Sequence, residues 1–246
     1  MNEFLADVRE LIAPGKDDKH GPLAPLLLGL TVVTGVVDAF SYLTLGHVFV
    51  ANMTGNVVFL ALALGGARGF SALASLNALA AFSVGAVVGG RLSTLLGHHR
   101  GRLLAVVSAL EALLLGVSAV IVTVAHGPGS GSVRYPLITV LGLSMGAQNA
   151  MARKLAVPDL TTSVLTMTLT GLSADSRVAG GGSSRAGRRL VAALAMFIGA
   201  LVGALFVLKV SRVGAVLLAA AVLAVIAVIT TVLSRSAGNS WAQAPT

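Results

Sequence analysis

Two carboxylic acids occur inside long apolar stretches of this sequence, where ionisable side chains are rare. Asp38 lies in the apolar run from about 23 to 45, and Glu111 lies in the run from about 103 to 125. A carboxylate at the centre of a bilayer costs about 2.5 to 3.5 kcal/mol on insertion scales unless it is protonated, paired or hydrated, so such residues are usually functional. Both acids are therefore candidates for proton or cation coupling, and a purely structural hydrogen bond is the alternative for each.

Neutral polar side chains gather around Asp38 and around a second place in the sequence. Hydroxyl and amide residues follow Asp38 closely, and a threonine-rich segment follows Gln148 and Asn149. Amides and hydroxyls both donate and accept hydrogen bonds, and glycine lets backbone or solute come close, so the set suits a small polar or ionic solute. The predicted solute-binding residues are Asp38, Asn52, Thr54, Gly55, Asn56, Gln148, Asn149, Thr166 and Thr168.

Several other kinds of chemistry are not indicated by the sequence. The chain has no cysteine, which excludes disulfides and thiolate metal sites. Neither a Ser/His/Asp set nor an HExxH motif is legible, so we expect no enzyme activity, no cofactor and no metal site. The net charge of +8 comes mostly from basic residues between the apolar runs, which is typical of membrane topology rather than of nucleic-acid binding.

The elements that position these residues are predicted to be membrane-spanning helices. Hydrophobic residues make up 56% of the chain and charged residues 11%, and the mean hydropathy is +0.92. Two short apolar segments, 48–64 and 160–172, are interrupted by glycine, so each predicts either a thin span or a re-entrant hairpin. Six longer runs each approach the roughly 20 residues that cross a bilayer. They are 23–45, 72–90, 103–125, 136–152, 190–208 and 213–233.

The distribution of lysine and arginine favours six spans plus two re-entrant segments. With eight spans, the seventeen basic residues divide ten to seven between the two sides of the membrane. With six spans and two re-entrant segments they divide thirteen to four, which agrees better with the positive-inside rule. We therefore expect a multi-pass membrane protein with both termini in the cytoplasm. Eight spans are the alternative. The four outward residues are Arg68, Arg134, Lys209 and Arg212.

Three short sequence matches predict an internal repeat. They occur in the same order in the two halves of the chain, at offsets of 111, 112 and 114 residues. A half with three spans and one hairpin crosses the membrane an odd number of times, so the second half must be inverted, as in many transporters. The matched segments are 35–39 with 146–150, 54–56 with 166–168, and 85–89 with 199–203.

The repeat also sets the expected boundaries and packing. The GxxxG pairs Gly85/Gly89 and Gly199/Gly203 let two helices approach closely. We expect them to pack helices inside the monomer, and a homo-oligomer face is the alternative. The expected parts are a cytoplasmic segment 1–22, a first repeat 23–125, an external loop 126–135, a second repeat 136–234 and a cytoplasmic tail 235–246.

Three motifs in the chain resemble a known family. They are GVVDAFSYLTLGHVFVANMTGN at 35–56, GAQNA at 146–150 and TTSVLTMTLTGL at 161–172. Together they resemble the YoaK-like family of bacterial membrane proteins, and the resemblance extends from about Pro25 to Leu233. It implies a polytopic inner-membrane protein with about six helices, and it supplies no substrate or site residues.

The sequence therefore predicts a membrane transporter or channel for a small polar or ionic solute, with its site between the two repeats. The alternative is a non-transporting scaffold or accessory subunit, in which the polar residues only tie helices together by interhelical hydrogen bonds. A hydrated junction between the two short segments favours transport, and a dry, packed junction favours the scaffold.

Overall fold

The chain is all-helical wherever the structure describes it. The computed structural model describes residues 2–15, 20–125, 131–158, 165–174, 180, 186–235 and 240–243. In these residues the only strand-like pairing is a single bridge between His99 and Gln243, so the predicted all-α class is confirmed. The helices are α1 Asn2–Ile12, α2 Leu23–Thr44, α3 Met53–Leu64, α4 Ala72–Leu96, α5 Arg100–Val124, α6 Gly131–Leu155, α7 Leu165–Ala174, α8 Ala186–Leu205, the π-helix η2 Phe206–Val210, α9 Arg212–Arg235 and the 3-10 helix η3 Ser240–Ala242.

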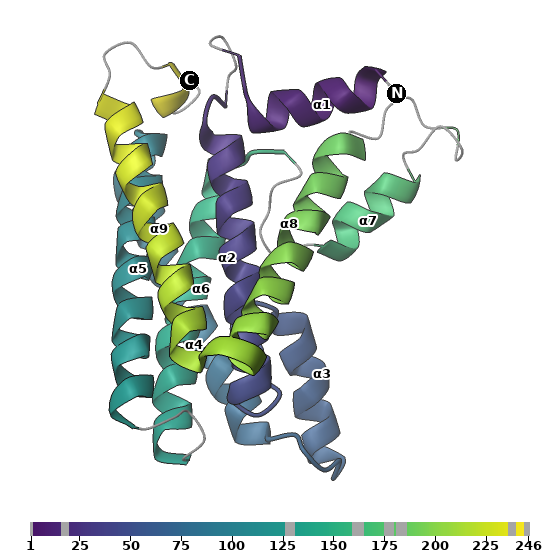
Figure 1. Ribbon diagram of the computed structural model, residues 1–246, viewed down its shortest axis with the longest axis vertical. Helices are drawn as coiled ribbons and strands as arrows, with labels where there is room; N and C mark the ends of the chain where they lie inside the picture. The colour runs from purple at the N-terminus through teal and green to yellow at the C-terminus, as the bar shows by residue number, and fades with distance from the viewer. Residues whose placement is uncertain are drawn as a thin grey trace.

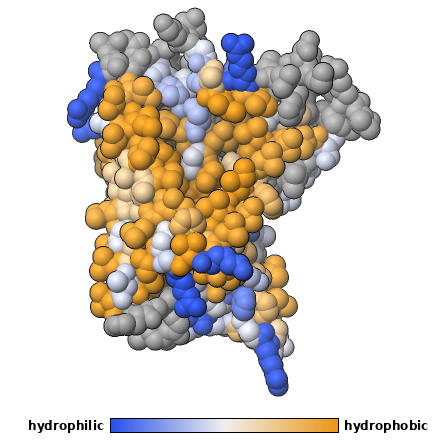
Figure 2. Space-filling model, viewed as in Figure 1, coloured by the Kyte–Doolittle hydropathy of each residue, from blue (hydrophilic) through white to orange (hydrophobic). Residues whose placement is uncertain are grey.

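Five of these helices are long and apolar enough to cross a membrane: α2, α4, α5, α8 continued through η2, and α9. They coincide with five of the six predicted runs. The sixth run forms α6, which has 25 residues but is less apolar and carries Gln148 and Asn149. Hydrophobic residues cover the middle of the visible face, and hydrophilic residues gather toward its two ends (Figure 2). The chain is therefore a multi-pass membrane protein.

The two short segments form helices too short to cross a bilayer. α3 has 12 residues and α7 has 10. At 1.5 Å per residue these helices are about 18 and 15 Å long, against a hydrocarbon core of about 30 Å. In Figure 1, α3 lies beside one end of the bundle, and α7 lies toward the other end, where α1 and both chain termini are found.

Contacts at the two ends show that α2 and α6 run in opposite directions. Arg134, near the start of α6, donates from Nη2 to the carbonyl oxygen of Gly46, just beyond the end of α2, at 3.2 Å. At the other end, Arg100 donates from Nη2 to the carbonyl oxygen of Leu155, the last residue of α6, at 2.7 Å. The same nitrogen lies 3.1 Å from Nδ1 of His20, which precedes α2.

Glycines set two close helix crossings, α4 on α6 and α2 on α8. At each glycine, a methyl group would overlap backbone atoms of the facing helix, so only glycine permits this approach. Both GxxxG pairs are thus used inside the chain, as expected from the sequence. The facing residues are Gly85 with Leu143, Gly89 with Ala147 and Gly146 with Phe82 in the first crossing, and Gly199 with Val32, Gly203 with Val36 and Gly35 with Met196 in the second.

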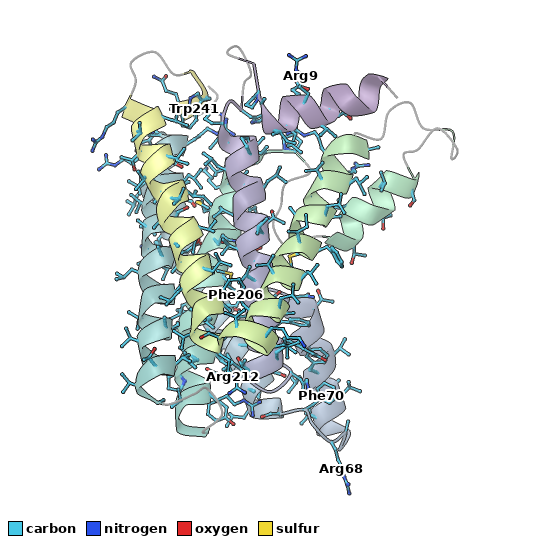
Figure 3. The ribbon with its side chains drawn as sticks, viewed as in Figure 1. Arg9, Arg68, Phe70, Phe206, Arg212 and Trp241 are labelled. Carbon is cyan, nitrogen blue, oxygen red and sulfur yellow. The ribbon has the colours of Figure 1, made fainter. Side chains whose placement is uncertain are left out.

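One end of the bundle is closed by elements that the apolar runs do not predict. α1 packs against α8, and Figure 1 shows it lying across the end of the bundle. Trp241, which the sequence places in a polar tail, is 7% exposed and packs against Gly21 and Gly101. Figure 3 labels Trp241 and Arg9 at this end and Arg68 and Arg212 at the opposite end.

Candidate solute site in the bundle interior

The polar residues of α2 lie on a buried face of that helix. Thr34 is 1% exposed, and its hydroxyl donates to the carbonyl oxygen of Leu30 at 2.9 Å. Asp38 comes one turn later on the same face and is 3% exposed. Its Oδ1 accepts hydrogen bonds from the backbone N–H groups of Val50, at 3.1 Å, and Ala51, at 2.9 Å. Asp38 therefore holds the non-helical backbone that follows α2.

That backbone, the 45–52 loop, is held from its other side by Asn56. Asn56 is fully buried at the start of α3. Its Oδ1 accepts from the N–H of Phe49 at 2.9 Å, and its Nδ2 donates to the carbonyl oxygen of Phe49 at 2.7 Å. Non-helical backbone at membrane depth must have its polar groups satisfied by protein or water. Asp38 and Asn56 bond some of these backbone groups. This structural role explains why two residues of the 35–56 motif are polar.

Aromatic rings pack the 45–52 loop against α3. Phe49 stacks on Tyr42, with ring centroids 5.1 Å apart, and on Phe59, at 5.6 Å. Phe59 in turn stacks on Phe70, at 5.2 Å. His47 has a positive φ of 57°, and its Nδ1 lies 3.1 Å from the carbonyl oxygen of Gly69. The histidine thus joins the loop to the α3–α4 connection.

Gln148 connects α6 to the polar face of α2. The side chain is fully buried, and its Nε2 donates to the hydroxyl of Thr34 at 2.8 Å. Its Oε1 has no hydrogen-bond partner among the described residues. Ser144 lies one turn earlier on the same face of α6, is fully buried, and has no partner for its hydroxyl in this part of the chain. α6 therefore adds polar atoms to the interior beside Thr34 and Asp38.

α5 contributes the second buried acid. Glu111 is fully buried, and neither of its carboxyl oxygens has a hydrogen-bond partner within the described ranges. Ser108, one turn earlier, is also fully buried and has no partner there. α5 packs against α6. We call the following six residues the interior polar cluster: Thr34, Asp38, Ser108, Glu111, Ser144 and Gln148.

The cluster unites part of the predicted site. Asp38, Glu111 and Gln148 belong to it, while Asn56 holds the adjoining loop. Asn149 is half-buried, and its Nδ2 donates to the carbonyl oxygen of Met145 within α6. Of the other predicted residues, Asn52, Thr54 and Thr166 are exposed, Gly55 lies against the ring of Phe49, and Thr168 is half-buried on α7, which packs against α8.

Three members of the cluster carry no motif that predicts them from the sequence. Thr34, Ser108 and Ser144 are single hydroxyl residues in runs of Val, Leu and Gly, where they carry no motif. The signal that identifies them is spacing, because each lies three or four residues before Asp38, Glu111 or Gln148 and therefore shares its helix face. The described residues contain no group of three or more His, Asp or Glu side chains that could hold a metal ion.

Comparison with known proteins agrees with this architecture. Residues 26–229 match the family model described as "Protein of unknown function (DUF1275)". The chain is 37% identical over 155 residues to the "UPF0700 transmembrane protein YoaK" of Bacillus subtilis (strain 168), an alignment that covers 61% of this chain and 65% of that relative. The chain thus covers slightly less than two thirds of the relative's length. No solved structure matches. The resemblance to a YoaK-like family is confirmed.

Proposed function

We propose a transport function for this chain, which belongs to the DUF1275 family, a family of proteins of unknown function. The protein is a transporter or channel for a small polar or ionic solute, and the interior polar cluster lines its path. The bilayer surrounds the bundle, and the solute passes between the two halves of the chain.

The observation that carries this proposal is the set of buried polar atoms without partners in three different helices. Asp38 Oδ2, both carboxyl oxygens of Glu111, the hydroxyls of Ser108 and Ser144 and Oε1 of Gln148 have no hydrogen-bond partner in the described part of the chain. Buried polar atoms are normally paired, since an unpaired one costs about 1 to 3 kcal/mol. A solute, an ion or ordered water in the interior supplies the missing partners.

The packing supports two inverted repeats, each with three spans and one short helix. In the α4 on α6 crossing, Gly85 and Gly89 face Leu143 and Ala147. In the α2 on α8 crossing, Gly199 and Gly203 lie 114 residues after Gly85 and Gly89, and they face Val32 and Val36. These two valines lie 111 residues before Leu143 and Ala147. The first helix of each half thus packs on the last-but-one helix of the other half by equivalent contacts. Because α2 and α6 are antiparallel, the halves are inverted.

This arrangement makes α6 the sixth span and leaves α3 and α7 as half-helices. Figure 3 labels Arg9 at one end of the bundle and Arg68 and Arg212 at the other. Of the lysine and arginine residues that the structure describes, Arg68, Arg134, Lys209 and Arg212 then belong to the second end, and the other nine belong to the end that holds Arg9. By the positive-inside rule the first end faces the cytoplasm of a bacterial inner membrane.

A second candidate function, the scaffold, is favoured by a different observation. Asp38 Oδ1 and the Asn56 amide bond the backbone of the 45–52 loop, which is what a purely structural role requires. The scaffold accounts for Asp38, for Asn56 and for the bond between Gln148 and Thr34. It gives no reason for the buried oxygens of Ser108, Glu111, Ser144 and Gln148 that have no partner among the described residues.

Flux measurements in proteoliposomes decide between the two. We would test purified protein against inorganic ions, protons and small neutral solutes, with Gln148→Leu as the test variant. Thr31→Val is the matched control, because Thr31 is buried on α2 one turn from Thr34 and its hydroxyl bonds only Leu27 of its own helix. We expect flux above that of empty liposomes for wild type and Thr31→Val, and at least tenfold less for Gln148→Leu. Flux no higher than in empty liposomes for every solute, or an equal flux in Gln148→Leu, contradicts the proposal.

The orientation is tested separately by single cysteines, since the chain has none of its own. A cysteine at Arg68 is expected to react with an impermeant maleimide added outside intact cells, and a cysteine at Arg9 is expected to react only after lysis. Labelling of position 68 only after lysis overturns the orientation.

A further inference from the structure

Glu111 is the least satisfied polar side chain of the interior. Asp38 is also an acid, but its Oδ1 already accepts two backbone N–H groups. Glu111 has neither carboxyl oxygen bonded within the described residues, although it is fully buried. An isolated carboxylate in a water-poor interior is strongly unfavourable unless it is protonated, paired or hydrated. A bound cation is one partner that meets this requirement.

The orientation of α5 places Glu111 on the side of the helix from which Arg100 reaches the end of α6. Arg100 and Glu111 are eleven residues apart, close to three helical turns, so they project from the same face of α5. The guanidinium of Arg100 reaches the end of α6 and His20 before α2. Glu111 thus projects from the same side of α5 about 16 Å further along the bundle, where α6 packs against α5.

The polar residues of α6 lie at the same depth. Measured from the Arg100–Leu155 contact, Glu111 is eleven residues along α5, and Ser144 is eleven residues back along α6. Ser108 and Gln148 are eight and seven residues from the same contact. Gln148 faces α2 through its bond to Thr34, and Ser144 shares that face. The partnerless oxygens of Ser108, Glu111, Ser144 and Gln148 therefore lie in one layer of the interior.

The chemistry of these atoms selects the kind of cation. All are oxygen donors, which suit hard cations such as Na⁺, Mg²⁺ and Ca²⁺ and not metals that prefer nitrogen or sulfur. Asp38 lies at this depth on α2, but its Oδ1 accepts two backbone N–H groups, so Glu111 is the carboxylate of the layer that has no donor among the described residues. A monovalent cation neutralises Glu111, and a divalent cation leaves one positive charge in excess of Glu111. A bound proton satisfies only one of the five oxygen atoms, whereas a metal cation accepts lone pairs from several at once.

We propose that Glu111, the hydroxyls of Ser108 and Ser144 and Oε1 of Gln148 form a binding site for a monovalent metal cation of the sodium class. The binding itself stands independently of transport. Its role as the coupling ion rests on the proposed function. Asp38 is then a positioning residue for the 45–52 loop, and Glu111 carries the charge.

Thermal unfolding of the full chain in detergent, followed by circular dichroism, tests the site directly. NaCl is compared with choline chloride at equal ionic strength and fixed pH. For wild type we expect the unfolding midpoint to rise with Na⁺, by about 3 to 5 °C at ten times the Kd. Glu111→Gln, which keeps the shape and removes the charge, is expected to lose this rise. Asp38→Asn and Glu10→Gln, an exposed acid on α1, are expected to keep it.

Three results overturn the proposal. A wild-type midpoint that does not respond to Na⁺, or responds only to pH, excludes a metal-cation site. If the midpoint of Glu111→Gln still rises fully with Na⁺, Glu111 is not a ligand of the cation. If the rise is lost in Asp38→Asn, the cation binds at α2 instead. Failure of the transport function looks different: the Na⁺ response persists while no solute crosses proteoliposomes. Conversely, flux that is present without any Na⁺ response leaves transport standing and removes the site.

Discussion

The two halves of the chain, α2–α5 and α6–α9, agree in how their helices pack and differ in their polar interior. The buried residues of α5 recur 112 residues later in α9, where Leu103, Leu104, Val107 and Leu115 correspond to the buried Ala215, Val216, Ala219 and Ala227. The glycines of the two crossings recur in the same way. Close packing is therefore a property of both halves.

The interior polar cluster, by contrast, breaks this correspondence. The offset of 111 pairs Thr34 with Met145, Gln148 with Val37 and Ser144 with Val33, and the offset of 112 pairs Glu111 with Leu223. All four counterparts are buried and apolar. The fold evidently needs no polar group at these positions, because one half is built without it. The glycines therefore belong to the architecture, and this difference supports our proposal that Thr34, Glu111, Ser144 and Gln148 serve function.

The largest effect is expected where the halves agree. Gly85→Ala and Gly199→Ala each place a methyl group on a backbone carbonyl, of Leu143 and Val32 respectively, which only a shift of the helix relieves. We expect each to lower the free energy of unfolding by about 3 kcal/mol or more, and by similar amounts, in SDS titrations followed by circular dichroism. Gly90→Ala is the control, since its methyl group meets nothing within 4 Å and removes backbone entropy from the unfolded chain. If Gly85→Ala and Gly199→Ala change the free energy of unfolding by different amounts, or if Gly90→Ala lowers it as well, the two crossings are not equivalent.

The sequence predicts these shared features well, because long apolar runs and repeated glycine pairs are visible in the sequence itself. Apolar runs give five of the spanning helices, and the repeated glycine pairs indicate the close crossings before any coordinates. α1 and the burial of Trp241 leave no such signal, because they depend on long-range contacts at one end of the bundle. The interior polar cluster is predictable in part: Asp38, Gln148 and Glu111 stand out as polar residues in apolar runs, but Thr34, Ser108 and Ser144 do not. Whether Asn52, Thr54, Thr166 and Thr168 bind solute stays a prediction.

A smaller effect is expected for the 45–52 loop of the first half. Asp38→Ala removes the acceptor for two backbone N–H groups, and Asn56→Ala removes two bonds to Phe49, so each should lower the free energy of unfolding by about 2 to 3 kcal/mol. Asp38→Asn keeps an oxygen in place of Oδ1, so it should lower the free energy of unfolding by less than about 1 kcal/mol. The same titrations measure all three. An Asn variant as unstable as the Ala variant shows that the loop requires the charge itself.

Replacing Glu111 with its counterpart makes the two halves more alike. Glu111→Leu introduces leucine, the residue type of the counterpart Leu223, in place of a carboxyl group that has no partner among the described residues. We expect the free energy of unfolding to rise by about 1 to 2 kcal/mol. We also expect flux in proteoliposomes to fall to that of empty liposomes. A stabilised but inactive variant is the signature of a functional residue that the fold does not need. A destabilised one shows that Glu111 supports the structure.

The smallest effect is expected when the loss of a hydrogen bond between the two halves is compared with the loss of one within a helix. Thr34→Val removes the acceptor of Gln148 Nε2 and leaves a buried amide N–H unpaired, whereas Thr31→Val on the same helix removes only a bond to the preceding turn. We expect Thr34→Val to be less stable than Thr31→Val by about 1 kcal/mol, since an orphaned buried donor is more unfavourable than a lost pair. In the Gln148→Leu background the two threonine variants should become equal, because the amide that distinguishes them is gone. A difference that survives in that background means that Thr34 contacts something other than Gln148, and the link between α2 and α6 then lies elsewhere in the interior polar cluster.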